Sequence, residues 1–337
     1  MILITGATGL VGSHLLLHLL TENPDDKITA LYRSETKKQK IINWLLYKNK
    51  NLNINNIIWK QIDITDIPEL EIAFQEINYV YHCAAIVDFA PKHKDLLNKV
   101  NIEGTANIVN LSLTYNIKKL CYVSSIATLS EPKIGHIIDE TCEWNPENFN
   151  GDYAISKNGG EIEVWRGIYE GLNAVIVNPG VIIGDGLWDS GSADLFNQVN
   201  KGLPFYTKGT TGFIAVTDVV KCMAMLMQSK NTAERYILVE SCPTFQQVIN
   251  TIAQSLNKPK PKIYAHNFLL QFAYFLDVLV CLFTSKKQQL TKDSIKVSQS
   301  ITIYNNSKIK ETLNIEFTPI LNYIETVSKE YLKYKNM

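Results

Sequence analysis

The sequence has few cysteines, no excess of either charge and no apolar run long enough to span a membrane. Its 337 residues include 33 Lys and Arg against 33 Asp and Glu, so the formal net charge is zero. Nucleic-acid-binding proteins usually carry a basic surface, and this balance therefore disfavours DNA or RNA as a partner. A hydrophobic fraction of 46% with 20% charged residues is ordinary for a globular chain and disfavours wholesale disorder.

The six cysteines are widely spaced and form no CxxC pair. This spacing argues against a disulfide framework and a cysteine-based zinc site, and we expect no metal centre. Free thiols are typical of a reducing compartment, which predicts a cytoplasmic protein. An apolar segment begins at Ile2 and runs directly into a glycine turn, so we expect no signal peptide before the fold.

One segment, Phe268 to Phe283, is almost wholly apolar. It is 16 residues long and contains Gln271 and Asp277, whereas a membrane-spanning helix needs ~20 apolar residues. We therefore predict no transmembrane span and interpret the segment as a buried or substrate-facing helix. A helix lying at a membrane surface is the alternative.

The first 180 residues alternate short apolar segments with amphipathic ones. The predicted strands are Ile2–Thr5, Ile28–Tyr32, Ile57–Gln61, Tyr79–His82, Lys119–Ser124 and Ala174–Asn178. Between the first two, leucines recur at helical spacing over residues 11–22. This alternation predicts an α/β fold of the Rossmann type, with a doubly wound parallel sheet and right-handed crossovers.

The alternation ends near residue 180, where glycines become frequent. Within residues 213–240, a helix and a strand are predicted to return to the sheet. We therefore expect a dinucleotide-binding Rossmann domain of residues 1–180, to which 213–240 return. Residues 181–212 and 241–337 are expected to form a smaller C-terminal substrate-binding lobe.

The clearest local motif is the run TGATGLVG at residues 5–12, which closes the first predicted strand and opens the first predicted helix. Gly6 permits the tight turn, Gly9 lets the backbone approach a pyrophosphate, and Gly12 lets the helix pack on the strand. The helix N-terminus offers free N–H groups to the phosphates. A glycine turn without a ligand is the alternative. The predicted cofactor contacts are Gly6, Thr8, Gly9, Leu10, Val11 and Gly12.

The second predicted strand ends with Tyr32 and Arg33, where NAD-binding folds of this type place an acidic residue. An arginine can bind the 2′-phosphate of NADP, which a carboxylate would repel. NADP(H) is therefore favoured as cofactor over NAD(H). The alternative is that these basic residues form a solvated loop that binds no cofactor. The other predicted cofactor contacts after strand ends are Asp63, Ile64, Ala84, Ala85 and Pro179. Asp63 is placed either to accept from the adenine amino group or to cap the following turn.

A second motif, YAISK, contains Tyr153 and Lys157. Residues i and i+4 share one face of a helix, so the phenol and the ammonium can lie together over a bound nicotinamide ribose. A free tyrosine titrates near ~10, and a neighbouring lysine with the positively charged cofactor ring favours its phenolate. Ser124 and Ser125 end the fifth strand, where a hydroxyl can donate to a substrate oxygen. The alternative is an ordinary surface pair.

These motifs belong to a longer series. It comprises TGATGLVG at 5–12, HCAA at 82–85, VNIEGT at 100–105, YVSS at 122–125, YAISK at 153–157, NPG at 178–180 and the segment 213–218. Together they resemble the extended short-chain dehydrogenases/reductases over essentially the whole chain, nearest the dihydroflavonol reductase and 3β-hydroxysteroid dehydrogenase branch. The resemblance implies a catalytic triad of Ser125, Tyr153 and Lys157, and a proton relay supported by Asn101. It also implies a homodimer through the helices near residues 94–113 and 153–170.

Two departures weigh against a nucleotide-sugar substrate. The run Gly212–Asp218 lacks the arginine that holds a sugar diphosphate in related epimerases, and Tyr32 stands where most of them keep an acid. The resemblance therefore implies an NADPH-dependent oxidoreductase with a small carbonyl or alcohol substrate of largely apolar character, with Tyr153 as general acid during reduction. The alternatives are an NAD-dependent epimerase or dehydratase of a nucleotide sugar, and a non-catalytic NADP-binding sensor.

Overall fold

A computed structural model describes residues 1–88, 93–130, 137–147, 151–188, 191–283 and 291–336. Within these residues, seven strands form one parallel sheet in the order β11-β7-β5-β4-β1-β2-β3. The strands are β1 (Ile2–Thr5), β2 (Ile28–Tyr32), β3 (Ile57–Gln61), β4 (Tyr79–His82), β5 (Lys119–Val123), β7 (Ala174–Pro179) and β11 (Glu234–Leu238). Strands β1 to β5 are arranged as in a Rossmann fold, with the topological switch between β1 and β4. The six predicted strands are confirmed to within one residue at each end, and β11 is the strand that was predicted to return to the sheet within residues 213–240.

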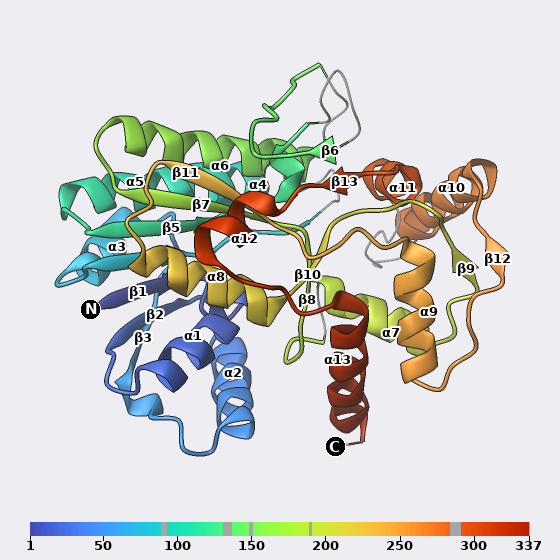
Figure 1. Ribbon diagram of the computed structural model, residues 1–337, viewed down its shortest axis with the longest axis horizontal. Helices are drawn as coiled ribbons and strands as arrows, with labels where there is room; N and C mark the ends of the chain where they lie inside the picture. Colours follow the sequence, from blue (N-terminus) through green and yellow to red (C-terminus); the bar gives the residue numbers. More distant parts are fainter. Residues whose placement is uncertain (89–92, 131–136, 148–150, 189–190, 284–290, 337) are drawn as a thin grey trace.

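Helices cover both faces of the sheet (Figure 1). Leu3 and Ile4 are neighbours on β1, so their side chains point to opposite faces, and both are fully buried. One face is covered by α1 (Leu10–Glu22), α2 (Glu35–Lys48) and α8 (Val216–Gln228), the other by α3 (Ile67–Phe74), α5 (Gly104–Thr114) and α6 (Asp152–Tyr169). The short α4 (Lys94–Leu97) and the π-helical turn η3 (Asn98–Glu103) lead into α5.

Most of the remaining elements build a smaller lobe beside the sheet, drawn at the right of Figure 1. The two-stranded pairs outside the main sheet, in the described residues, are β8 (Val181–Ile183) with β10 (Phe213–Ala215), β9 (Phe205–Tyr206) with β12 (Ile263–Tyr264), and β6 (Ile137–Ile138) with β13 (Ile303–Tyr304). The helices of the lobe are α7 (Asp194–Asn200), α9 (Phe245–Ser255), α10 (Asn267–Phe283), α11 (Lys292–Gln299) and α13 (Ile320–Lys335). Helix α12 (Ser307–Leu313) instead packs against β11 and α8 of the sheet layers. Trp188 and Phe196 form an aromatic core with Tyr331 of α13, with ring centroids 5.1 to 6.1 Å apart.

Helix α10 coincides with the apolar segment seen in the sequence, but it is not buried. The exposed fractions of Phe268, Phe272 and Phe275 are 79%, 54% and 58%. Only its opposite side packs, with Leu270 in a small cluster that includes Ile295 of α11. The prediction of a buried helix is therefore wrong for the side of α10 that carries these three rings, and a substrate-facing role stays a prediction. In the described part of the chain, none of the helices has the length and hydrophobicity needed to span a bilayer.

Candidate functional site

The turn between β1 and α1 has the geometry of a phosphate cradle. Gly6 has φ +66°, and a Cβ there would lie 2.7 Å from the Cα of Ala84. A Cβ on Gly12 would lie 2.3 Å from the carbonyl oxygen of Gly6. Both glycines are therefore required by this close approach of backbone segments. Helix α1 starts at Leu10 with Gly9 as N-cap and no side-chain cap bond, which leaves first-turn amides available to an anion.

A cavity of about 150 Å³ opens beside this turn, at the carboxyl ends of β1 to β4. Its lining residues are Gly6, Thr8, Gly9, Leu31, Tyr32, Arg33, Lys37, Ile62, Ile64, Cys83, Ala84, Ala85 and Val100. Seven of these are predicted cofactor residues. Of the others predicted, Leu10, Val11 and Gly12 belong to the first turn of α1, and Pro179 ends β7. The position of this cavity and the geometry of its glycines fit a dinucleotide bound at the topological switch point of the sheet.

Two cations lie at the end of β2. Arg33 and Lys37 both line the cavity, whereas Lys38 is held by Glu35 at 2.6 Å and by the Tyr32 hydroxyl at 3.5 Å. Arg33 is half-exposed, with its Nη1 3.8 Å from Oδ2 of Asp63.

Asp63 also caps the turn that follows β3. Its Oδ1 accepts from the backbone N and the Oγ1 of Thr65, at 3.0 and 2.9 Å. The structure thus shows the capping role that the sequence left open for Asp63. A contact of its Oδ2 with adenine stays a prediction.

The two strand-end serines point to different partners. The Ser125 hydroxyl hydrogen-bonds with the Tyr153 phenol, and its Oγ accepts from the backbone N of Ala127 at 3.1 Å. Ser124 instead donates to Oε2 of Glu161 at 2.6 Å. Ser125, the serine favoured from sequence, therefore lies against Tyr153. Burial raises the pKa of Tyr153, and the hydrogen bond from Ser125 opposes that rise. The protein alone therefore does not favour the phenolate, contrary to the expectation from the Tyr153 and Lys157 spacing.

Lys157 lies one helical turn after Tyr153 and is fully buried. Its Nζ donates to the Tyr122 hydroxyl at 3.0 Å and to the Val123 carbonyl oxygen at 2.8 Å. Burial lowers the pKa of Lys157 to about 7, although the carboxylate of Glu161 opposes this shift. The lysine therefore joins helix α6 to the end of β5, beside the serine pair.

The buried carboxylate of Glu161 accepts hydrogen bonds from the segments around the two serines. Five side chains donate to it: Ser124, Thr128 and Asn178 to Oε2 at 2.6, 2.8 and 2.9 Å, and Arg235 and Trp165 to Oε1 at 3.2 and 3.4 Å. These donors belong to α6, to β7 and β11, and to the segment after β5. Glu161 thus fixes the strand end that carries Ser125.

Asn101 links the segment after β4 to helix α6 through three hydrogen bonds. Its amide donates to the carbonyl oxygen of Ile86 at 3.0 Å and to Oγ of Ser156 at 2.9 Å, and it accepts from the N of Ile86 at 2.8 Å. The side chain therefore pins the segment after β4 to helix α6. The proton relay implied by the family stays a prediction.

His82 lies within a buried chain of hydrogen bonds. Its Nδ1 is 2.7 Å from Oγ1 of Thr5, and its Nε2 is 3.0 Å from Oγ1 of Thr105. Thr105 donates onward to the Asn101 carbonyl oxygen at 2.7 Å. Burial lowers the pKa of His82 to about 3, so the ring is neutral at physiological pH. This geometry suits a structural role.

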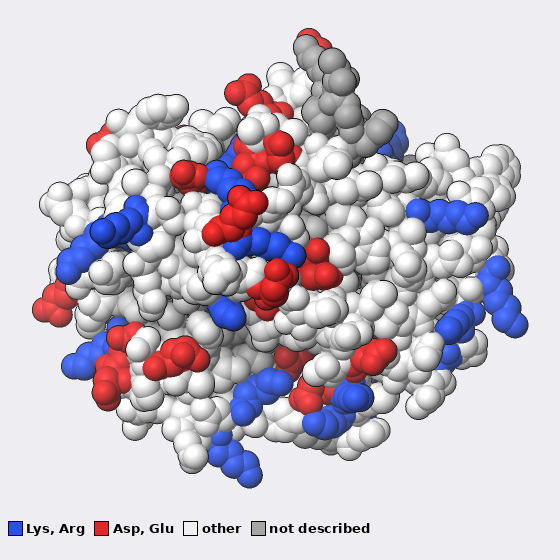
Figure 2. Space-filling model, viewed as in Figure 1, with Lys and Arg blue, Asp and Glu red and all other residues white. Residues whose placement is uncertain are grey.

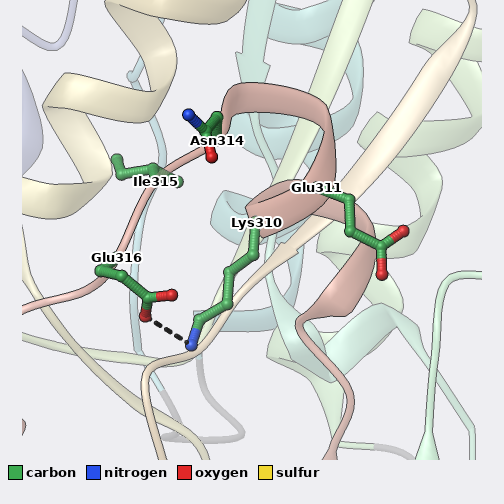
Figure 3. Close-up of a pocket in the computed structure, with 5 residues that line it drawn as sticks. All are labelled: Lys310, Glu311, Asn314, Ile315 and Glu316. Carbon is green, nitrogen blue, oxygen red and sulfur yellow. Dashed lines mark hydrogen bonds and ion pairs between the residues drawn. The ribbon is translucent and has the colours of Figure 1, made fainter.

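A second hollow, of about 250 Å³, lies on the surface beside α12 (Figure 3). It is lined by Lys310, Glu311, Asn314, Ile315 and Glu316. The Nζ of Lys310 and Oε2 of Glu316 form an ion pair at 3.1 Å. All of these residues come from one short segment remote in sequence from the cradle, and we assign no function to this hollow.

Comparison with known proteins identifies the family. The model of the NAD dependent epimerase/dehydratase family matches residues 2–239. The chain belongs to this family. It is an NAD(P)-dependent enzyme of the extended short-chain dehydrogenase/reductase type, as the motifs predict.

Similar proteins include reductases and epimerases. The chain is 26% identical over 321 residues to the putative dihydroflavonol 4-reductase of Synechocystis, covering 93% of this chain and 89% of the relative. The crystal structure of gox2253 superposes with a TM-score of 0.82 at 23% identity, covering 100% and 99% of the two chains. A UDP-glucose 4-epimerase from Thermotoga maritima gives a TM-score of 0.76 at 20% identity, with the same coverage. At such identities, the two structures establish the fold.

Two polar partners of the Ser124, Ser125 and Lys157 cluster, Tyr122 and Glu161, were not predicted from the sequence. Both have a signal in the sequence. Tyr122 lies two residues before Ser124, so a strand places them on the same face. Glu161 lies four residues after Lys157, so a helix places it on the face of the Tyr153 and Lys157 pair.

Replacing Lys157 by methionine is expected to change the pH dependence of stability. The Lys157 pKa is about 7 in the folded enzyme, against ~10.4 for an unfolded lysine. Between these values the unfolded wild type binds more protons, so wild-type stability rises with pH in this window. The unfolding free energy of Lys157→Met minus that of the wild type should therefore fall by roughly 2 kcal/mol from about pH 7 to about pH 9.

Urea unfolding of the cofactor-free enzyme at both pH values measures this difference. The matched control is Lys99→Met, which removes an exposed ammonium from η3. Its stability should track that of the wild type at both pH values. A Lys157→Met difference that does not change with pH would contradict the low pKa.

Proposed function

We propose that this enzyme is an NADPH-dependent oxidoreductase that reduces a ketone or aldehyde on a largely apolar small molecule. The observation that carries the proposal is the cluster of Ser125, Tyr153 and Lys157, combined with Arg33 and Lys37 at the end of β2. The first three provide an acid–base site, and the two cations favour a phosphorylated ribose. The similarity to the dihydroflavonol reductase of Synechocystis supports a reductase with an apolar substrate.

Each residue has a distinct role in the proposed reaction. NADPH, held by the glycine turn and the first turn of α1, supplies the hydride when it is bound. The Ser125 hydroxyl orients the carbonyl oxygen, and Tyr153 gives its phenolic proton to that oxygen as negative charge develops there. The raised pKa of Tyr153 keeps the phenol protonated at neutral pH, which is the state that a proton donor needs. Lys157 would bind the nicotinamide ribose beside it.

The substrate and subunit arrangement follow from the same proposal. We assign substrate binding to the lobe of residues 181–212 and 241–337, beside the dinucleotide domain of 1–180. We further propose a homodimer through helices α5 and α6. In support, Ile162 and Tyr169 of α6 are 55% and 89% exposed.

A nucleotide-sugar epimerase has the same fold but less support. The run Gly212–Asp218 forms the buried strand β10 and the start of α8. Asp218 accepts from the backbone N and Oγ1 of Thr318, at 2.7 and 3.1 Å. The segment thus ties the C-terminal chain to α8 and contains no arginine for a sugar diphosphate.

Replacing Arg33 by alanine is expected to weaken NADPH binding about 10- to 100-fold, because a charge-assisted hydrogen bond to phosphate contributes about 1.5–3 kcal/mol. NADH lacks that phosphate, and its affinity should change by less than about threefold. Fluorescence titration of the wild type and the variant with both cofactors measures the two effects.

The matched control is Lys38→Ala, which removes a nearby cation in the first turn of α2 whose ammonium already pairs with Glu35. Its NADPH affinity should stay within about threefold of the wild type. Wild-type binding of NADH that equals or exceeds that of NADPH, and that does not depend on Arg33, would refute the cofactor assignment.

A further inference from the structure

Residues 241–300 of the lobe carry an excess of positive charge, although the whole chain has a net charge of zero. Residues 241–300 contain seven lysines, no arginine and no glutamate, with Asp277 and Asp293 as the two acids. Lys258, Lys260 and Lys262 are all exposed and directly precede β12. On the face drawn in Figure 2, the end of the molecule that carries β9, β12 and α10 is white with blue groups and shows no red. This end is therefore locally basic in a chain of zero net charge.

The same end presents an apolar helix face. Phe268, Phe272 and Phe275 follow one another at helical spacing along α10, and each is more than half exposed. The opposite face of α10 is held by α11 in a cluster that includes Leu270 and Ile295. The three phenyl rings thus project from a helix that is anchored on its other side.

The strand pair next to α10 also exposes apolar side chains. Phe205 of β9 and Ile263 of β12 are register partners that share one face, and they are 40% and 47% exposed. Tyr264 lies on the other face, with its ring centre 5.8 Å from that of Tyr206 and 4.9 Å from the Nζ of Lys208. Figure 1 shows β9, β12 and α10 along one end of the molecule, remote from the N-terminus. Aromatic rings flanked by lysines are typical of surfaces that meet lipid headgroups.

We propose that this surface, the α10 surface (Phe268, Phe272 and Phe275, with Phe205 and Ile263 of the neighbouring strands and Lys258, Lys260 and Lys262), docks the enzyme onto an anionic lipid membrane. The phenyl rings enter the headgroup region, and the lysines attract the lipid phosphates. The interaction is peripheral, with the helix lying in the interface plane. It does not depend on which reaction the enzyme catalyses.

Charge favours a membrane over a second copy of the chain. A two-fold contact through this surface would bring lysines of one copy against the same lysines of the other, which is repulsive. An anionic bilayer offers complementary charge beside an apolar layer. Both features of the α10 surface are satisfied by that one partner.

Co-sedimentation of the full chain with vesicles tests the proposal. The probes are vesicles of phosphatidylcholine with about 30 mol% phosphatidylglycerol, and vesicles of phosphatidylcholine alone. We expect binding to the anionic vesicles that weakens at high salt. The triple variant Phe268→Ser/Phe272→Ser/Phe275→Ser should bind them at least about tenfold more weakly. Lys258→Gln/Lys260→Gln/Lys262→Gln should weaken binding to a similar degree.

The control is Ile67→Ser/Ile72→Ser, which removes two apolar side chains, 47% and 52% exposed, from α3 in the dinucleotide domain. It should bind vesicles like the wild type, and all variants should keep the wild-type NADPH affinity as a test of folding. Three results would overturn the proposal: a wild-type enzyme that does not bind the anionic vesicles, lobe variants that bind them as well as the wild type does, or a wild-type dimer in light scattering that only the triple phenylalanine variant abolishes.

Discussion

Replacing Tyr153 by phenylalanine should lower turnover by about 100- to 10 000-fold, the contribution of a positioned proton donor. The substitution removes one oxygen atom, the one that hydrogen-bonds with Ser125. Because the ring remains, the packing at the start of α6 should persist. The loss should therefore appear in kcat, with NADPH affinity within about threefold of the wild type.

The same helix provides the control for this experiment. Tyr169 ends α6 and is 89% exposed, so Tyr169→Phe makes the same chemical change where no reaction takes place. It should leave kcat unchanged. Steady-state reduction of a carbonyl substrate, followed by NADPH absorbance, compares the three enzymes. A Tyr153→Phe enzyme with more than a tenth of wild-type turnover would remove Tyr153 from the role of acid.

Glu161→Gln should be the most destabilising single change at the site. The carboxylate is buried and accepts from five side chains, including the charged Arg235 at 3.2 Å. The amide of a glutamine would direct an NH₂ group at side chains that themselves donate hydrogen bonds. It would also leave the Arg235 guanidinium without its counter-ion. Breaking a buried ion pair in this way costs about 3–5 kcal/mol. Urea unfolding at neutral pH measures the loss.

Glu163→Gln is the matched control, two residues further along α6. Glu163 pairs with Arg166 at 2.8 Å on the helix surface, where such a pair contributes about 0–1 kcal/mol. If the two variants lose the same stability, the hydrogen bonds to Glu161 do not hold the strand ends as described.

Turnover should fall with Glu161→Gln as well, because Ser124 and Ser125 would lose their fixed position.

Local patterns were enough to predict the dinucleotide half of the fold. The turn at Gly6 and Gly12 needs glycine for reasons set by adjacent backbone, so the requirement is visible in a short motif. The strands are continuous apolar runs because both faces of the sheet are covered. The pairing of Ser125 with Tyr153 was expected from the family resemblance of the two motifs that contain them.

Contacts between distant segments could not be predicted in this way. Arg235 reaches Glu161 across 74 residues, and Lys157 reaches Tyr122 across 35 residues. No spacing rule relates residues that only the folded sheet brings together. The exposure of α10 was hidden for a related reason: an apolar sequence shows that a face avoids water, but not whether another element of the chain covers it.

The central claim is that the enzyme consumes NADPH to reduce a carbonyl group, and the most direct measurement follows both at once. Wild type and Tyr153→Phe are incubated with NADPH and a panel of apolar ketones and aldehydes. Loss of absorbance at the nicotinamide band is compared with the alcohol formed. We expect the wild type to oxidise one NADPH for each alcohol formed and the variant to oxidise almost none. Nucleotide-sugar conversion with no net consumption of NADPH would contradict it and would establish an epimerase or dehydratase instead.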